Sequence, residues 1–245
     1  MPKILLTITG TWSESHSVNW MECATTWVPL IKKQGIDVLF LMSNPHLDRE
    51  YEIKGNFFFA KCPDTVKKIY WKNHYYISKY FLEETDYDYR FHTDSDTFIH
   101  PERFKQLLED FTINNPKDYM GCVLPYPGFN VNDNRSEEIK GEGFYASGGS
   151  GFLLSRKSHR YLVEDFNEEE YEHLGFCDKI TGEILYNRGI KLWHDSRLLF
   201  ESPWNRTIAD PHNLGSPFIG DKDSFLAVQH YCNGHMYELK QKLTL

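Results

Sequence analysis

The sequence has no long apolar run, and none approaches the roughly 20 residues that a membrane-spanning helix needs. It also has no block of basic residues, and its 35 acidic side chains against 27 basic ones give a formal net charge of −8. This balance argues against nucleic acid as the main partner. No internal repeat or low-complexity segment occurs, so repeat architectures are excluded as well.

Cysteine is scarce: the five residues are scattered, odd in number and never arranged as Cys-x-x-Cys. Such a pattern is typical of reduced, mostly buried thiols in a cytosolic protein rather than of a disulfide framework. Residues 1–9 are too short for a secretory signal and instead predict a first strand. We therefore expect a cytoplasmic chain without a membrane span.

What the sequence does hold is apolar material, with 40% hydrophobic and 16% aromatic residues over 245 positions. That length and composition suffice for a large core in one α/β domain. Apolar runs at residues 3–9 and 37–42 flank a helical pattern at residues 17–27, an order that predicts a parallel strand–helix–strand unit. The other expected strands are residues 57–59, 87–93, 119–124, 152–154, 191–193 and 227–231, other helices begin near residues 64, 101, 155 and 178, and residues 44–55, 125–145 and 201–223 are expected to be irregular.

Two carboxylates, Asp94 and Asp96, directly follow the apolar strand expected at residues 87–93. Ligands of open α/β sheets bind at the carboxyl ends of the strands. Two carboxylates at this spacing can hold a hard divalent cation such as Mg²⁺ or Mn²⁺, with other positions left for water and substrate phosphate. This layout suits a nucleoside-diphosphate sugar, and the alternative for the bare pattern is a solvated turn.

Three further features are candidates for the same site. The glycines in residues 147–151, above all Gly148 and Gly149, let backbone amides approach a ligand closely, although an ordinary tight turn is the alternative. Asp178 is either the N-cap of a helix or a general base that takes the proton of an acceptor hydroxyl, and both roles are compatible. An imidazole at His230 would complete the coordination begun by the carboxylates, and Glu201 is a rival for that position.

Taken together, these landmarks resemble the core 1 β1,3-galactosyltransferase and Fringe-like group of inverting GT-A glycosyltransferases, which is glycosyltransferase family 31-like. The resemblance covers nearly the whole chain, in order. It rests on residues 24–27, 38–43, 70–72, 89–99, 145–152, 177–182, 195–197 and 230–239. Its most specific motif is the block at residues 145–152, which is similar to the family's Ser/Thr-Gly-Gly-Ala-Gly-aromatic block.

This resemblance implies a single catalytic domain with the GT-A fold, a Rossmann-like, mixed and mostly parallel sheet flanked by helices. Residues 1–124 would form the nucleotide-sugar-binding half and residues 125–245 the acceptor-binding half. The resemblance further implies a Mn²⁺-type ion on Asp94 and Asp96, with Asp178 as the base of an inverting reaction. The residues it assigns to the nucleotide-sugar donor are Trp71, Lys72, Asp94, Ser95, Asp96, Gly148 and Gly149.

Three departures from the family pattern qualify that assignment. Cys177 replaces the first acid of an acidic pair, so that Asp178 is left as a single candidate base. Glu201 stands where the group tends to have His, so the third metal ligand is either Glu201 or His230. The family's N-terminal membrane anchor is not evident, which favours a cytoplasmic enzyme of a bacterial or viral type.

The expected activity is therefore metal-dependent, inverting transfer of a hexose from a nucleotide-diphosphate sugar to a glycan or another hydroxyl acceptor. UDP-galactose or another UDP-sugar is the expected donor. One alternative is a non-catalytic relative that binds a sugar or a partner on the same scaffold. The other is a nucleotide-sugar hydrolase or a nucleotidyltransferase. The intact trio Asp94, Asp96 and Asp178 favours catalysis over binding alone.

Overall fold

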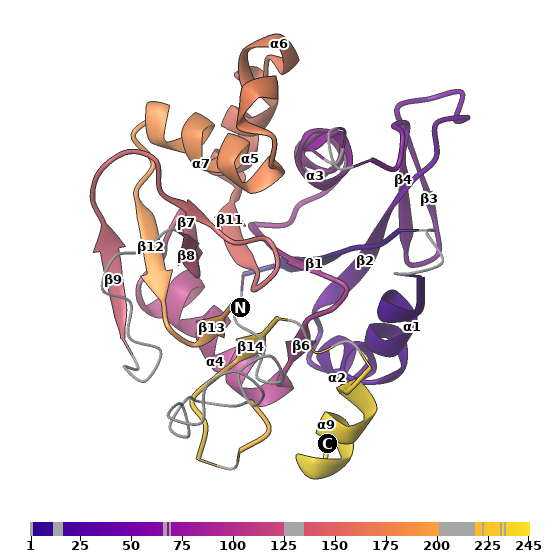
Figure 1. The fold of residues 1–245 in the computed structure, drawn as a ribbon, viewed down its shortest axis with the longest axis vertical. Coiled ribbons are helices and arrows are strands. Elements are labelled where there is room, and N and C mark those ends of the chain that lie inside the picture. The colour runs from indigo at the N-terminus through magenta and orange to yellow at the C-terminus, as the bar shows by residue number, and fades with distance from the viewer. Residues whose placement is uncertain are drawn as a thin grey trace.

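The structure, a computed structural model, describes residues 2–11, 17–65, 68, 70–124, 135–200, 219–221, 223–230, 232 and 234–245. In these residues a nine-stranded sheet runs through the centre of the molecule (Figure 1). Its strands, in spatial order, are β3 (Tyr51–Lys54), β4 (Phe57–Ala60), β2 (Asp37–Ser43), β1 (Ile4–Thr9), β5 (Tyr89–Asp94), β11 (Phe152–Ser155), β7 (Tyr119–Gly121), β12 (Leu192–Asp195) and β9 (Ser136–Ile139).

The sheet is mixed and mostly parallel, as the sequence predicts. Strands β4, β2, β1, β5, β7 and β12 run in one direction, and β3, β11 and β9 run in the other. The parallel block around β1 holds the carboxyl ends of β1 and β5 side by side, because Thr9 is in register with Asp94.

Helices cover both faces of the sheet (Figure 1). One face carries α3 (Ile77–Glu83), α5 (Arg156–Glu164), the short α6 (Glu168–Tyr171) and α7 (Cys177–Asn187), and the other carries α1 (Ser17–Thr25), α2 (Val28–Lys33), α4 (Pro101–Glu109) and α9 (Met236–Lys242). Irregular helical turns precede α3, follow α4 and follow α6, at Trp71–Tyr76, Asp110–Asn114 and Glu172–Leu174. Within the described residues, none of these helices combines the length and apolar character needed to cross a bilayer.

Strand β5 shows how the alternation of side chains builds both layers. Phe91 points to the α4 side, where its ring meets Phe104 edge-on at a centroid distance of 4.8 Å. Arg90 and His92 occupy the alternate positions and are also fully buried. The polar face of β5 therefore leads, beneath the helices, directly to Asp94 at its end.

Two small pairings position the segments that matter for the site. Strands β13 (Leu198–Leu199), β14 (Val228–Gln229) and β6 (Phe98–Ile99) form a three-stranded sheet. Strands β8 (Val123–Leu124) and β10 (Tyr145–Ala146) form an antiparallel pair. The strand expected at residues 119–124 is thus divided at Cys122, and its second part leaves the main sheet.

Two stretches expected to be irregular contain strands. Strand β3 lies within residues 44–55 and pairs antiparallel with β4, and β9 lies within residues 125–145 and pairs with β12. Both strands are at the edges of the sheet and carry several polar side chains, so they lack the apolar run that marks a buried strand. Residues 125–134 of the second stretch, and most of residues 201–223, lie outside the described part of the chain.

The helix expected to begin near residue 64 is described from Tyr70, which is the N-cap of its first described turn. Residues 66, 67 and 69 lie outside the described part of the chain. The carboxylate of Asp64 accepts hydrogen bonds from Ser43 at 3.2 Å and from Lys72 at 3.1 Å. Asp64 therefore makes tertiary contacts near the ends of β1 and β2.

Candidate active site

Asp94, Asp96 and His230 form a cluster of candidate metal ligands. Each offers one carboxylate oxygen or ring nitrogen, and these atoms all lie within 4.8 Å of one another. The His230 Nε2 atom is 2.9 Å from Asp96 Oδ1. Carboxylate oxygens suit Mn²⁺ and Mg²⁺, and an imidazole nitrogen is a common ligand of transition-metal ions. The donor set therefore fits a divalent cation, and fits Mn²⁺ better than Mg²⁺.

The pairing of two short strands brings His230 to this position. Strand β6 begins two residues after Asp96 and pairs with β14, which ends one residue before His230. The Cys232 N–H also donates to the Asp96 carbonyl at 2.6 Å, which fastens the two segments on either side of the cluster. The rival ligand Glu201 lies outside the described residues.

The carboxylate of Asp94 titrates far from its usual range. Burial raises its pKa to about 7, and the negative charges of Asp96 and Asp178 add to this effect against the opposing influence of His230 and a hydrogen bond from Thr9. Burial would lower the pKa of His230, but the hydrogen bond to Asp96 and the nearby carboxylates outweigh it and raise that pKa. Without a cation, the cluster therefore retains protons at neutral pH.

We expect the affinity of the cluster for Mn²⁺ to rise by at least about tenfold per pH unit below pH 7 and less steeply above it. Below the pKa of Asp94 an incoming cation must displace the proton of that carboxylate, and it must also displace the proton of His230, whose pKa is raised. Titration calorimetry in buffers with different ionisation enthalpies measures both the affinity and the proton release. An affinity independent of pH would contradict the assignment of Asp94 as a ligand.

The glycine turn at residues 148–151 packs directly against the cluster. The Gly149 carbonyl accepts hydrogen bonds from Thr93 Oγ1 at 3.0 Å and from Thr97 Oγ1 at 2.6 Å, so the turn is fixed to the strand that carries Asp94. A Cβ atom on Gly149 would lie 2.3 Å from the His230 ring, and one on Gly148 would lie 2.7 Å from the Asp178 carboxylate. Both distances are shorter than real Cβ contacts, so a larger residue at either position requires the His230 ring or the Asp178 carboxylate to move.

The two neighbouring glycines give a matched pair of substitutions. Gly149→Ala should displace the His230 ring and lower Mn²⁺ affinity by at least about tenfold, the cost of disturbing a ligand's surroundings. Gly148→Ala should displace Asp178 and lower turnover by about 100-fold, the cost of a misplacement near 1 Å. Calorimetry and rate measurements on both variants, with melting curves as the control for folding, test this division. If both variants lose Mn²⁺ affinity and turnover to the same extent, the two glycines do not have separate roles.

Asp178 lies beside the turn and is not the N-cap of its helix. The N-cap of α7 is Phe176, and Asp178 sits in the first helical turn. Its carboxylate accepts the Gly148 N–H at 2.7 Å and the Cys177 thiol at 3.3 Å. The helix begins earlier than the sequence predicts, so that this side chain is directed to a tertiary partner instead of its own backbone.

The charge of Asp178 affects the pKa of a residue in the ligand cluster. It is one of the causes that raise the pKa of Asp94, so the two carboxylates belong to one site. Burial raises the pKa of Asp178 itself, against the opposing effect of the Gly148 N–H, the Cys177 thiol and His230. A carboxylate with a raised pKa is a stronger proton acceptor than an ordinary one, which suits a general base.

The other residues predicted to bind the nucleotide-sugar donor lie partly at the site and partly beside it. Lys72 is buried and donates to the Gly10 carbonyl at 2.8 Å, one residue beyond the Thr9–Asp94 register pair. Ser95, which stands between Asp94 and Asp96 in the sequence, is buried, and its carbonyl accepts a hydrogen bond from the Cys23 thiol. The Trp71 indole donates to Glu168 at 3.1 Å, so its known contact is with the helical layer.

Sequence reasoning missed two polar residues at this edge of the sheet. The Thr9 side chain hydrogen-bonds Asp94, and its hydroxyl oxygen lies 3.3 Å from His92 Nε2. The Asp64 carboxylate accepts hydrogen bonds from Thr11, Ser43 and Lys72. The signal for Thr9 was present, because Thr7 and Thr9 are the two polar residues of an otherwise apolar strand.

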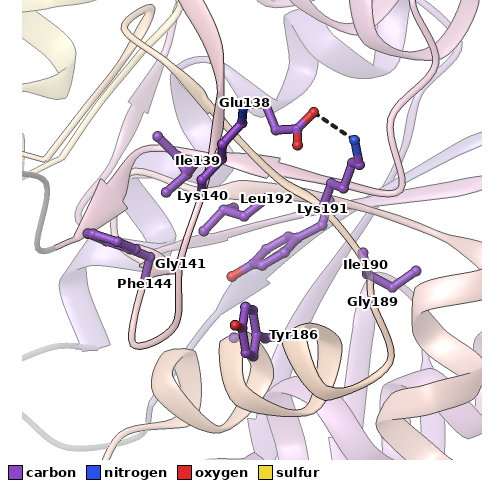
Figure 2. Close-up of a pocket in the computed structure, with 12 residues that line it drawn as sticks. Glu138, Ile139, Lys140, Gly141, Phe144, Tyr186, Gly189, Ile190, Lys191 and Leu192 are labelled. Atoms are coloured by element: carbon purple, nitrogen blue, oxygen red, sulfur yellow. Dashed lines mark hydrogen bonds and ion pairs between the residues drawn. The ribbon is translucent and has the colours of Figure 1, made fainter.

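A separate cavity of about 240 Å³ lies between the connection from β9 to β10 and the C-terminal half of α7 (Figure 2). Phe144 and Tyr186 contribute aromatic walls, and Glu138 and Lys191 form an ion pair of 2.9 Å beside it. None of the metal-ligand candidates, nor Asp178, lines this cavity. It is distinct from the site described above.

The sequence model of the family described as Fringe-like matches residues 16–187 of the chain. The chain belongs to the Fringe-like family. The match includes Asp94, Asp96, the glycine turn and Asp178, and it ends before His230. The family resemblance predicted from the sequence is confirmed.

Among curated proteins, this Fringe-like chain is similar to the glycoprotein-N-acetylgalactosamine 3-beta-galactosyltransferase 1 of Xenopus laevis. The two are 29% identical over 128 residues, which are 48% of this chain and 31% of that protein. The aligned part thus spans about a third of the relative's length.

Solved structures show the same architecture at low sequence identity. A glycosyltransferase involved in glycosylation of the major capsid of PBCV-1 has a TM-score of 0.51 and 11% identity, covering 99% of both chains. The galactosyltransferase LgtC, solved with donor and acceptor sugar analogs, has a TM-score of 0.52 and 15% identity, covering 98% of this chain and 96% of that one. The GT-A fold expected from the sequence is therefore confirmed.

Proposed function

We propose that this Fringe-like chain is a metal-dependent, inverting glycosyltransferase that moves a hexose from a nucleotide-diphosphate sugar to an acceptor hydroxyl. The donor in this proposal is UDP-galactose or another UDP-sugar, and the product has a β-glycosidic bond. The acceptor is a glycan or another hydroxyl compound. The Xenopus laevis relative is named a galactosyltransferase, which supports galactose as the sugar.

One observation carries this proposal: two glycines in succession pack against two different chemical groups, Gly149 against His230 and Gly148 against Asp178. The candidate cation ligands and the candidate base are thereby held on adjacent backbone positions. Asp94, Asp96 and His230 would hold Mn²⁺, which when bound supplies Lewis-acid stabilisation of the negative charge on a departing diphosphate.

The protein's own residues account for the proton transfer. The Asp178 carboxylate takes the proton of the acceptor hydroxyl as that oxygen attacks the anomeric carbon. The Gly148 N–H, at 2.7 Å, holds the carboxylate in a fixed orientation during this step. A single displacement of this kind inverts the anomeric configuration and needs no covalent intermediate, so one base is sufficient.

The donor would lie along the carboxyl ends of β1 and β5. In this proposal Lys72, Ser95, Gly148 and Gly149 contact it directly, and Trp71 does so from the helical layer. The two chain halves keep the roles expected from the sequence, with residues 1–124 binding the donor and residues 125–245 binding the acceptor.

The release of UDP from a panel of UDP-sugars with Mn²⁺, measured with and without acceptor sugars, tests the function. Release that requires an acceptor, with a β-linked product seen by proton NMR, is the expected result. Release without an acceptor would identify a nucleotide-sugar hydrolase instead. No turnover with any donor, combined with measurable sugar binding, would identify a non-catalytic relative.

A further inference from the structure

A second group of candidate metal ligands lies on the base side of the glycine turn. A ring nitrogen of His74, the Cys177 sulfur and an Asp178 oxygen all lie within 4.8 Å of one another. The Cys177 thiol already donates to Asp178 Oδ1 at 3.3 Å. Unlike the cluster at Asp96, this group includes a sulfur, so it differs in the ions that it prefers.

Two buried polar atoms beside this group have no protein partner. His74 is completely buried, and its Nε2 atom makes no hydrogen bond within the described residues. Asn73, which is 1% exposed and hydrogen-bonds the Cys177 sulfur, leaves its Oδ1 atom unpaired in the same part of the chain. A buried polar atom without a partner costs free energy, and native proteins rarely contain one without a ligand, water or ion to satisfy it.

We propose that His74, Cys177 and Asp178 form a binding site for a thiophilic divalent ion of the Zn²⁺ class, distinct from the Mn²⁺ site. Sulfur, imidazole and carboxylate ligands at one point are the donor set that zinc takes, whereas Mn²⁺ prefers oxygen. Three protein ligands leave a fourth position for water, and the Asn73 side chain, which hydrogen-bonds the Cys177 sulfur, supports that ligand from outside.

Binding of the ion at this second site releases one proton to solvent. The ion forms a bond to the Cys177 sulfur as the thiol proton leaves for solvent, because only the thiolate is a ligand. Burial and the carboxylates of Asp178 and Asp94 raise the pKa of the Cys177 thiol, so the ion must displace this proton. The Arg90 guanidinium is buried nearby and has an electrostatic interaction with Cys177. Arg90 lies 3.4 Å from His74 Nδ1 and can only donate, so the ring proton of neutral His74 is on Nε2, the ring atom without a partner. When Nε2 coordinates the ion, this proton moves to Nδ1 and the Arg90 contact with Nδ1 is released, so the net proton released to solvent is the one from the thiol.

The site overlaps the residue proposed as the base, and this consequence rests on the proposed function. A carboxylate that coordinates an ion cannot accept the proton of an acceptor hydroxyl. Zn²⁺ bound at Cys177 is therefore an inhibitor of Mn²⁺-supported turnover, and the Cys177→Ser variant should resist that inhibition by at least about tenfold in Zn²⁺ concentration.

Binding itself is tested with Co²⁺ as a spectroscopic probe for Zn²⁺, independently of turnover. The purified full chain with one equivalent of Co²⁺ should show a sulfur-to-cobalt charge-transfer band that Zn²⁺ abolishes. Cys177→Ser should lose the band. Cys62→Ser, which changes a buried cysteine next to Ser43, should keep it, and so should Asp96→Asn. A band that survives in Cys177→Ser overturns the proposal.

The unmodified protein provides the second test, which does not depend on the folding of any variant. Cys177 is half-buried, whereas the other four cysteines are buried. Zn²⁺ should protect Cys177 from alkylation by iodoacetamide, as measured by peptide mass spectrometry, and Mg²⁺ should not. Equal labelling of Cys177 with and without Zn²⁺ overturns the proposal, whether or not the chain transfers sugar.

Discussion

Replacement of Asp178 by Asn is expected to lower turnover by at least about 100-fold, the usual contribution of a general base. The binding of UDP with Mn²⁺ should stay within about twofold of the wild type, because Asp178 is not among the proposed cation ligands. The Asn amide accepts the Gly148 N–H through its oxygen, so the local hydrogen bond survives while the proton acceptor is lost. Single-turnover rates and calorimetric binding measure the two quantities separately.

Glu183→Gln is the matched control for this experiment. It removes a carboxylate from the same helix, α7, at a position outside both ligand clusters. Its turnover should equal that of the wild type. If Asp178→Asn transfers sugar at an unchanged rate, Asp178 is not the base.

Replacement of Asp96 by Asn is expected to lower Mn²⁺ affinity by at least about 100-fold. Substitution of residues that only support the ligands already lowers metal affinity by about 10- to 100-fold, and loss of a ligand should cost at least as much. Metal-dependent donor binding should be lost with it. The substitution removes a ligand oxygen and also the carboxylate that holds His230 Nε2 at 2.9 Å. Calorimetry with Mn²⁺, followed by UDP titration at saturating Mn²⁺, measures both losses.

Two further variants separate the alternatives for the third ligand. His230→Gln should weaken Mn²⁺ binding by at least about tenfold, and Glu201→Gln should leave it unchanged, because His230 is the residue that lies within the cluster. Asp86→Asn, at a strongly exposed ion pair with Lys3, is the control for general charge effects. The reverse order of the first two effects would assign the position to Glu201.

The strand that carries Asp94 could be predicted from the sequence because the information is local. An apolar run of strand length ends at the carboxylates, and the fold places that end beside the end of β1. The glycine turn was also predictable, since three glycines within four residues predict a tight turn whether or not it borders a ligand. Both features depend on short segments whose pattern is strong.

The partners of these residues were not predictable in the same way. His230 was named as a candidate ligand and a strand was expected at residues 227–231, but the contact with Asp96 depends on the pairing of two-residue strands, β6 and β14, and no periodic pattern predicts that pairing. The role of Asp178 as an N-cap was wrong for a related reason. Whether a carboxylate in the first turn bonds to its own helix or to Gly148 depends on what packs above it, which no local pattern contains.

The position of His230 in the chain has a consequence for synthesis. Every strand of the central sheet precedes it, so a ribosome completes all strands of that sheet before the imidazole of the proposed cation cluster exists. A nascent chain can acquire its architecture early and yet be unable to retain an ion until β14 docks on β6. Under the proposed function, uptake of the ion therefore comes late in maturation.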